Sequence, residues 1–326
     1  MAIDRSTPIG FIGTGVMGAS MAGHILQAGY PLHVFTRTKA KAAALIEAGA
    51  VWEKSVATLA GKCPVIFTMV GFPTDVKEIY FGKNGLLKKA KPGSYLIDTT
   101  TSPPELAKNL YEQGKDRDLH VLDAPVTGGD IGAREAKLSI MVGGDEDDFQ
   151  AMLPLLRLLA TTVVHQGEAG AGQSAKICNQ IALAGVMLGV CEALAYAEAA
   201  GLSPEKLLAS IEHGGAASWV LSNLGRRIIE GDFAPGFYVK HFVKDLKIAS
   251  EEAEASGLFT PTIDLALSAY EELDDSGYGD LGTQALYGLY AGEVGDNDDW
   301  LFDEDEDDPL LDDEASDDYD DEPKRR

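Results

Sequence analysis

The chain has 326 residues, 45% of them hydrophobic, and a formal net charge of −25. This length and composition provide for a sizeable buried core and predict two domains rather than one. The charge is uneven, because residues 296–326 hold 17 acidic and 3 basic residues and the other 295 residues have a net charge of −11. Neither part has the basic stripe that nucleic acid binding requires, so we expect no nucleic acid partner.

Cysteine usage points to a reducing environment, and the histidines give no sign of a metal site. The three cysteines and six histidines show no paired or metal-ligand spacing, so we expect no disulfide framework and no metal site. The N-terminus lacks the basic and apolar regions of a signal peptide, and the apolar run at 181–191 is about half a bilayer span. These features predict a soluble, cytoplasmic protein with no membrane partner.

The chain opens with the pattern strand, glycine turn, helix, strand. Residues 9–12 lead into the glycine turn, and residues 19–28 and 32–35 follow as a helix and a second strand. The three glycines suit a tight turn, a close approach of pyrophosphate and close packing of helix on strand, respectively. In this context the pattern predicts dinucleotide binding rather than a structural turn. The cofactor residues expected here are Gly13, Thr14, Gly15, Val16, Met17 and Gly18.

Strands and helices continue to alternate through the first half of the chain. Further strands are expected at 65–70, 95–98, 120–123 and 138–142, with helices such as 39–48 and 104–113 between them. This alternation is typical of a doubly wound, mostly parallel sheet. The expected fold class is therefore α/β, with a Rossmann domain over residues 1–166.

A long segment without proline begins at Gly170 and runs to about Ala200, and we expect it to be one helix shared by two domains. Lys176, Asn179 and Gln180 lie at spacing i, i+3, i+4, so their side chains share one face. A lone lysine there would usually lay its stem on apolar surface and reach water. Apolar residues then recur at helical spacing, which predicts an all-α domain over 167–295. Its helices are expected at 204–213, 219–230, 239–255, 262–272 and 283–291.

Three strand ends carry loops rich in glycine or hydroxyl groups, at 70–73, 98–102 and 123–129. Ligands of doubly wound sheets lie beyond the carboxyl ends of the strands. Hydroxyl and free N–H groups in the second and third loops are suited to a carboxylate, although such clusters more often form turns and caps.

Ordered motifs over residues 9 to about 292 resemble the β-hydroxyacid dehydrogenases. This family includes 3-hydroxyisobutyrate dehydrogenase, tartronate semialdehyde reductase and glyoxylate/succinic semialdehyde reductase. The matching motifs are Gly10–Gly18 with Met21-Ala22, Asp98–Thr101, Asp123–Gly129, Gly170-x-Gly172-x-x-x-Lys176-x-x-Asn179 and Lys244-Asp245-Leu246.

The resemblance implies an NAD(P)-dependent oxidoreductase that interconverts a short β-hydroxy or 2-hydroxy acid and its semialdehyde or oxo acid. Lys176 would be the general acid/base, its pKa lowered from about 10.4 by burial and by Lys244, and Asn179 would hold the reacting oxygen. The residues implied in binding the small carboxylate substrate are Thr101, Thr127, Gly128, Gly129, Gln180, Phe237 and Asp245. The further cofactor contacts implied are Val70, Thr101 and Lys244.

Departures from the family pattern affect the substrate and the cofactor. Thr127 stands where serine is usual, and Ala136 replaces a common glycine. NAD-preferring enzymes carry an acid at the end of the second strand, whereas this chain has Arg37 and Thr38 there and no acid before Glu47. We therefore expect NADP(H) to be favoured over NAD(H). A solvated Arg37, or one stacked on adenine, would allow either cofactor.

Two rival hypotheses remain at this point. One is a non-catalytic dinucleotide-binding module whose acidic tail is its working part, and the other is an enzyme of the glyoxylate/succinic semialdehyde reductase type. Lys176 argues against the module and against the imine reductases, which share the architecture. Relatives imply a homodimer or homotetramer. Residues 296–326, with acid runs and no periodicity, are expected to be a disordered tail.

Overall fold

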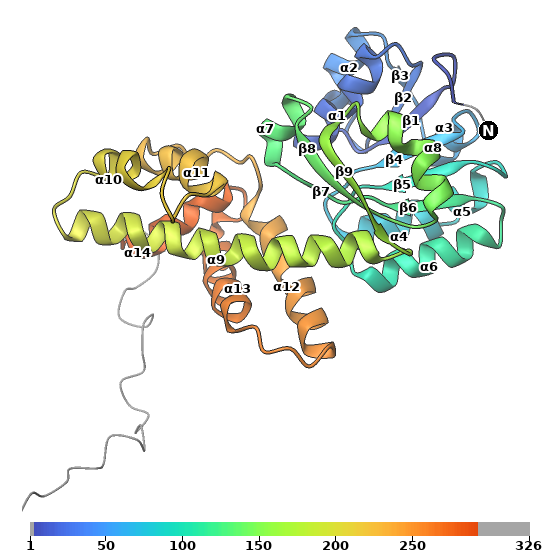
Figure 1. Ribbon diagram of the computed structural model, residues 1–326. Coiled ribbons are helices and arrows are strands. Elements are labelled where there is room, and N and C mark those ends of the chain that lie inside the picture. Colours follow the sequence, from blue (N-terminus) through green and yellow to red (C-terminus); the bar gives the residue numbers. More distant parts are fainter. Residues whose placement is uncertain (1–2, 293–326) are drawn as a thin grey trace, which may run out of the picture.

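The computed structural model describes residues 3–292, so the expected disorder of 296–326 lies outside the described residues. Within them, an N-terminal domain with one sheet is followed by a helical domain, and a single long helix runs through both (Figure 1). The strands are β1 (Ile9–Ile12), β2 (Leu32–Phe35), β3 (Val51–Trp52), β4 (Val65–Thr68), β5 (Tyr95–Asp98), β6 (His120–Asp123), β7 (Val126–Thr127), β8 (Leu138–Gly143) and β9 (Ala160–Gly167).

The nine strands form one sheet in the order β3-β2-β1-β4-β5-β6-β8-β7, with β9 paired to β8. Pairing is parallel from β3 to β6, whereas β8 runs antiparallel to β6 and β7. The chain order reverses at β1, which lies between β2 and β4. The carboxyl ends of β1, β2 and β4 therefore open onto the same crevice, where such sheets bind their ligands.

Helices cover both faces of this sheet (Figure 1), and its central strands are largely apolar and buried. On β4, Val65 and Phe67 belong to the core on one face and Ile66 to the core on the other. A strand buried on both faces reads as a continuous apolar run. The helices of this domain are α1 (Val16–Gln27), α2 (Ala43–Glu47), α3 (Val56–Ala60), α4 (Pro73–Phe81), α5 (Leu86–Lys89), α6 (Pro104–Lys115), α7 (Gly129–Arg134) and α8 (Glu146–Leu156), with a 3₁₀ turn at Lys39–Ala42.

Helix α9 (Ala171–Ala199) joins the domains. Its 29 residues span about 43 Å at ~1.5 Å per residue. The first turns pack against β8, β9 and α6, and the remainder forms the core of the second domain with α11, α12 and α13. The other helices of this domain are α10 (Pro204–Ile211), α11 (Trp219–Ile229), α12 (Val239–Ala255), α13 (Pro261–Leu273) and α14 (Tyr287–Tyr290), with a π turn at Asp274–Tyr278 and a 3₁₀ turn at Thr283–Leu286.

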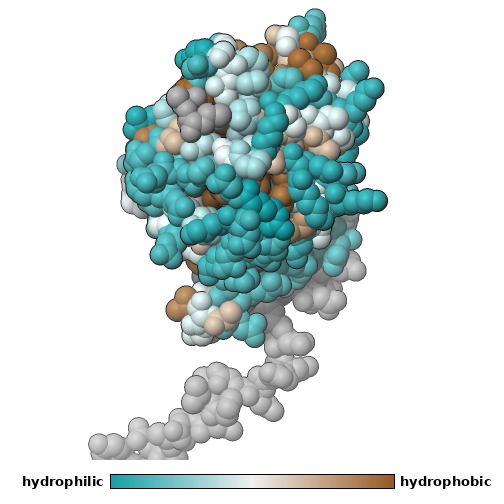
Figure 2. Space-filling view, turned by 90° about the vertical axis from the view of Figure 1, so that its right-hand side faces the viewer, coloured by the Kyte–Doolittle hydropathy of each residue, from teal (hydrophilic) through white to brown (hydrophobic). Residues whose placement is uncertain are grey.

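By length and composition alone, α9 is also apolar enough to cross a membrane. Nearly half of its most apolar window, 44%, is buried inside the protein, and a core helix meets the same criteria. Seen from the end formed by the N-terminal domain, the surface is mostly polar, with small separate apolar patches (Figure 2).

The α/β fold class, the Rossmann sheet, the long interdomain helix and the all-α second domain are confirmed. Three strands had not been predicted: β3 and β7 have only two residues each, and only one of the eight residues of β9 is buried. The strand expected at 65–70 ends at Thr68, because Val70 leaves the sheet and donates its N–H to the Thr100 hydroxyl, 3.1 Å away. The helices expected at 39–48 and 283–291 each divide into a 3₁₀ turn and a short α-helix.

Candidate active site

The glycine turn between β1 and α1 has the geometry that a phosphate-binding turn requires. Gly13 has φ +95°, and a Cβ there would overlap the Met69 carbonyl oxygen; a Cβ on Gly18 would overlap that of Gly13. Around Gly15, by contrast, there is open space within 4 Å. The buried Thr14 hydroxyl has no hydrogen-bond partner among the described residues. The turn thus offers free polar groups and room at the N-terminus of α1, which fits a bound dinucleotide.

A cleft of about 1370 Å³ lies over this turn and reaches the second domain. Its volume exceeds the roughly 300–1,000 Å³ of most small-molecule pockets, as an extended ligand requires. Every residue predicted to contact the cofactor lines it: Gly13, Thr14, Gly15, Val16, Met17, Gly18, Arg37, Thr38, Val70, Thr101 and Lys244. Phe237 and Asp245 line it as well, whereas the other predicted substrate and catalytic residues are not in its lining.

Lys176 lies in the second turn of α9 with only 6% of its surface exposed. Burial, helped by the nearby charge of Lys244, lowers its pKa to about 8, although Asp245 opposes this shift. Its ammonium makes no hydrogen bond or ion pair with any residue in 3–292. Lys176 is therefore a buried lysine whose ammonium has no fixed partner among the described residues.

The neighbours of Lys176 form a continuous polar network. The Asn179 amide donates to Gln180 Oε1 at 2.7 Å, and Gln180 Nε2 donates to Asp245 Oδ2 at 2.6 Å. Lys244 pairs with Asp245 Oδ1 at 2.6 Å and donates to the Thr101 carbonyl at 2.8 Å. Gln180 is thus held at both ends between Asn179 and Asp245. The structure brings together α9, α12 and the loop after β5, as the sequence predicted.

Asp123, at the end of β6, fixes the start of α9. Its two carboxylate oxygens accept the N–H groups of Gly170 and Gln173 at 2.8 and 2.9 Å, within a site so tight that a Cβ on Gly143 would collide with them. Burial raises the pKa of Asp123, while these hydrogen bonds oppose the rise. The Gln173 side chain adds hydrogen bonds to the Thr100 carbonyl and the Ser102 N–H. Neither residue had been predicted as part of the site.

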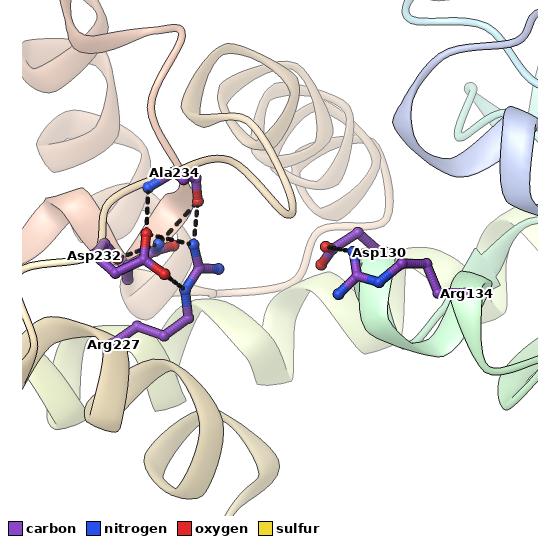
Figure 3. Close-up of polar contacts among 6 residues, drawn as sticks. Asp130, Arg134, Arg227, Asp232 and Ala234 are labelled. Carbon is purple, nitrogen blue, oxygen red and sulfur yellow. Dashed lines mark hydrogen bonds and ion pairs between the residues drawn. The ribbon is translucent and has the colours of Figure 1, made fainter. Parts of the chain in front are cut away.

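The predicted carboxylate loop joins β7 to α7. Thr127 ends β7, and Gly128 and Gly129 have φ of +126° and +64°, which exposes successive N–H groups. The indole of Trp219 on α11 approaches Gly129 from the second domain. Figure 3 shows two separate polar groups nearby: Asp130 pairs with Arg134 on α7, and Arg227 of α11 is held by Asp232 and Ala234.

A second contact between the domains crosses the cofactor cleft. The His241 ring on α12 meets Phe72 edge-on, with ring centroids 5.2 Å apart. Burial and the charge of Lys244 lower the His241 pKa to about 4, so its imidazole is neutral near pH 7. Sequence reasoning did not single out His241. Among residues 3–292, no cluster of three or more His, Cys, Asp or Glu side chains is suited to hold a metal ion.

Comparisons with known proteins agree with this geometry. Residues 8–167 match the family model described as the NAD binding domain of 6-phosphogluconate dehydrogenase. Residues 170–290 match the model described as NAD-binding of NADP-dependent 3-hydroxyisobutyrate dehydrogenase.

Similar proteins match nearly the whole of the described chain. An uncharacterised oxidoreductase of Bacillus subtilis is 53% identical over 87% of this chain and 98% of its own length. A probable 3-hydroxyisobutyrate dehydrogenase-like mitochondrial protein of Arabidopsis thaliana is 46% identical, over 86% and 84%. The structure of Mycobacterium tuberculosis 3-hydroxyisobutyrate dehydrogenase with L-serine has a TM-score of 0.77 at 30% identity, over 86% and 98%.

A Rossmann domain whose cofactor cleft is closed by a helical domain defines the protein as an NAD(P)-dependent oxidoreductase. The chain belongs to the β-hydroxyacid dehydrogenase family, whose relatives act on CH–OH groups. The resemblance seen in the sequence is thereby confirmed. The prediction of an enzyme is confirmed as well, in preference to the rival hypothesis of a non-catalytic binding module.

Proposed function

We propose that this enzyme interconverts a short 3-hydroxy acid and its semialdehyde, with Lys176 as the general acid/base. The observation that carries this proposal is the buried Lys176 ammonium, which has no fixed partner and a pKa lowered to about 8. An acid/base group works best when its pKa lies near the operating pH, and an unperturbed lysine lies more than two units higher. The second candidate, a glyoxylate/succinic semialdehyde reductase, would use the same lysine.

A bound nicotinamide dinucleotide supplies hydride exchange with the carbon that bears the hydroxyl. Lys176 takes the hydroxyl proton during oxidation and returns it to the oxygen during reduction. The Asn179 amide has two hydrogens and gives one to Gln180, so the other is free to donate to the same substrate oxygen. Gln180 and Asp245 act as positioning residues, because both side chains are committed to the network.

The substrate carboxylate is assigned to the Thr127 hydroxyl and the N–H groups of Gly128 and Gly129. Successive glycines with positive φ form a concave set of N–H donors that suits an anion without a full positive charge. Phe237, which lines the cleft between the domains, is assigned to the apolar side of the substrate. The methyl group of Thr127 leaves less room than serine would, which favours a small substrate.

NADP(H) is proposed as the preferred cofactor. Arg37, Thr38 and Lys41 line the cleft at the end of β2, where a guanidinium and an ammonium favour the 2′-phosphate. A separate observation supports the proposed substrate class. The L-serine in the similar Mycobacterium tuberculosis structure is itself a 3-hydroxy acid.

Steady-state assays of the full chain test both parts of this proposal. The substrates are 3-hydroxyisobutyrate, L-serine, tartronate semialdehyde, methylmalonate semialdehyde, glyoxylate and succinic semialdehyde, each with both cofactors. We expect the highest kcat/KM for a 3-hydroxy acid pair and a larger value with NADP(H) than with NAD(H). Highest turnover of glyoxylate or succinic semialdehyde would instead support the second candidate, and no turnover of any of these would contradict the proposal.

We also propose a homodimer or homotetramer, formed through the helical domain. Five large apolar side chains among the described residues of that domain are more than half exposed: Tyr196, Leu202, Leu258, Phe259 and Leu265. Large apolar side chains that are exposed to this degree are candidates for an association surface. The mass of the full chain by light scattering reports the assembly, and a monomer at micromolar concentration would contradict it.

A further inference from the structure

An acid that the sequence places far from the second strand lies against Arg37 in the structure. Asp75 Oδ1 is 3.0 Å from Arg37 Nη1, and both residues line the cofactor cleft. Asp75 belongs to α4, which follows β4, whereas Arg37 follows β2. Both strands flank β1, so their carboxyl ends meet at the point where the strand order reverses.

The position of Asp75 is well defined. Pro73 begins α4, and Asp75 lies in its first turn, where the helix dipole favours a negative charge. Only 15% of the Asp75 side chain is exposed, compared with 77% of that of Arg37. Arg37 is therefore the partner that is free to move, and Asp75 is the fixed one.

One oxygen of Asp75 is uncommitted. Oδ1 pairs with Arg37, whereas Oδ2 faces Gly71 and accepts no hydrogen bond from any residue in 3–292. In dinucleotide-binding folds that prefer NAD, an acid at the end of the second strand accepts the ribose hydroxyl. This chain lacks that acid, and Asp75 brings a carboxylate to the same part of the crevice from the next element.

We propose that Asp75 sets the balance between NAD(H) and NADP(H), as a specificity residue that replaces the missing acid of β2. Its carboxylate accepts the 2′-hydroxyl of the adenosine ribose in NAD(H), and its charge offsets that of Arg37 and repels the 2′-phosphate of NADP(H). This inference rests on the proposed role of Arg37 as the phosphate contact. It implies that Asp75 limits the preference for NADP(H).

Binding measurements separate Asp75 from Arg37. Isothermal titration calorimetry on the full chain gives Kd for NAD⁺, NADP⁺ and adenosine 2′,5′-bisphosphate in the wild type, Asp75→Asn, Arg37→Ala and the double variant. In Asp75→Asn we expect the ratio Kd(NAD⁺)/Kd(NADP⁺) to rise about tenfold, because the repulsion and the ribose acceptor are both lost. In Arg37→Ala it falls about tenfold. In the double variant, the effect of Asp75→Asn on this ratio should be smaller, because there is no Arg37 guanidinium to be released from its pair with Asp75.

Glu212→Gln provides the matched control. Glu212 pairs with Arg226 at 2.6 Å, and the exposed fractions, 10% and 55%, resemble those of the Asp75–Arg37 pair, but the pair lies outside the cleft. The same loss of one charge there should leave the ratio unchanged. Asp75→Ser is a second variant that removes the carboxylate, for the case in which the amide of Asp75→Asn donates to a phosphate by itself.

The outcomes distinguish this inference from the cofactor preference on which it rests. An unchanged or lowered ratio in both Asp75→Asn and Asp75→Ser would overturn the role of Asp75. If Arg37→Ala leaves the ratio unchanged while the Asp75 variants raise it, the phosphate role of Arg37 is wrong, but Asp75 still determines specificity. A raised ratio in Glu212→Gln of the same size would show that net charge alone is responsible, and would also overturn the inference.

Discussion

Replacement of Lys176 by alanine is expected to lower kcat by about 10²–10⁴-fold, the range typical for loss of a general acid/base. The variant keeps the glycine turn and the cleft residues, so the Kd for NADP⁺ should stay within about twofold of the wild type. Removing the buried ammonium also removes a group whose charged form is disfavoured by burial, so the fold should tolerate the change. Stopped-flow absorbance of the reduced cofactor and a separate binding titration measure the two quantities.

A lysine outside the cleft is the control for this prediction. Lys247 lies on α12, two residues after Asp245, and pairs at the surface with Glu271. Lys247→Ala should retain the wild-type kcat. If Lys176→Ala keeps more than a tenth of the wild-type turnover, or loses cofactor binding to the same degree as turnover, the acid/base assignment is wrong.

Asp123→Ala should lower the free energy of unfolding by about 2–6 kcal/mol, the largest effect on stability that we expect. Its carboxylate accepts the N–H groups of Gly170 and Gln173 inside the protein, and each buried donor left without a partner costs about 1–3 kcal/mol. Denaturant unfolding followed by circular dichroism measures the change. Activity should fall as well, because these bonds fix the start of the helix that carries Lys176.

Asp148→Ala provides the comparison within the same domain. Asp148 is also mostly buried, but it contacts one side chain, His120, at 2.7 Å near the surface. We expect a loss of about 0–1 kcal/mol, as for other partly exposed pairs. If the two variants lose equal free energies of unfolding, the hydrogen bonds of Asp123 to the start of α9 do not give it the special structural role assigned here.

The sequence was most informative where function depends on residues close together in the chain. The glycine turn and the group Lys176, Asn179 and Gln180 each lie on one element, so local periodicity predicts which side chains share a face. The strand-end loops also converge as expected, because parallel strands place their carboxyl ends at one edge. Lys244 and Asp245 were identified by the family motif rather than by any local pattern.

Contacts that depend on the order of strands in the sheet were not predicted. Asp75 and Arg37 are 38 positions apart, and only the placement of β2 and β4 on either side of β1 brings them together. The argument for NADP(H) from the absence of an acid after the second strand was therefore incomplete. The sequence did contain a signal for this contact. Asp75 follows Pro73 at the start of a helix, and that helix comes directly after a strand of the same sheet.

The side-chain network around Lys176 likewise required the structure. Asn179 was expected to hold the substrate oxygen, and one of its amide hydrogens proves to be committed to Gln180. Gln180 in turn reaches Asp245, a contact between α9 and α12 that no spacing in the sequence encodes. The catalytic and binding roles of these residues remain predictions.

The pH dependence of kcat/KM tests the central claim most directly, because it reports the groups that titrate in the free enzyme. Oxidation of the hydroxy acid needs neutral Lys176 to accept a proton, and reduction needs its ammonium form. Since its pKa is lowered to about 8, kcat/KM for oxidation should rise with pH through about 8, and that for reduction should fall. Asp98, whose pKa burial raises to about 7, titrates nearby, and Asp98→Asn should retain the inflection near 8.

The decisive measurement is therefore kcat/KM from pH 6 to 10 in both directions, for the substrate pair with the highest turnover. Opposite profiles that share an inflection near pH 8 are the predicted result. A profile that is flat over this range in both directions, or that changes in the same sense in both, would contradict proton transfer by Lys176.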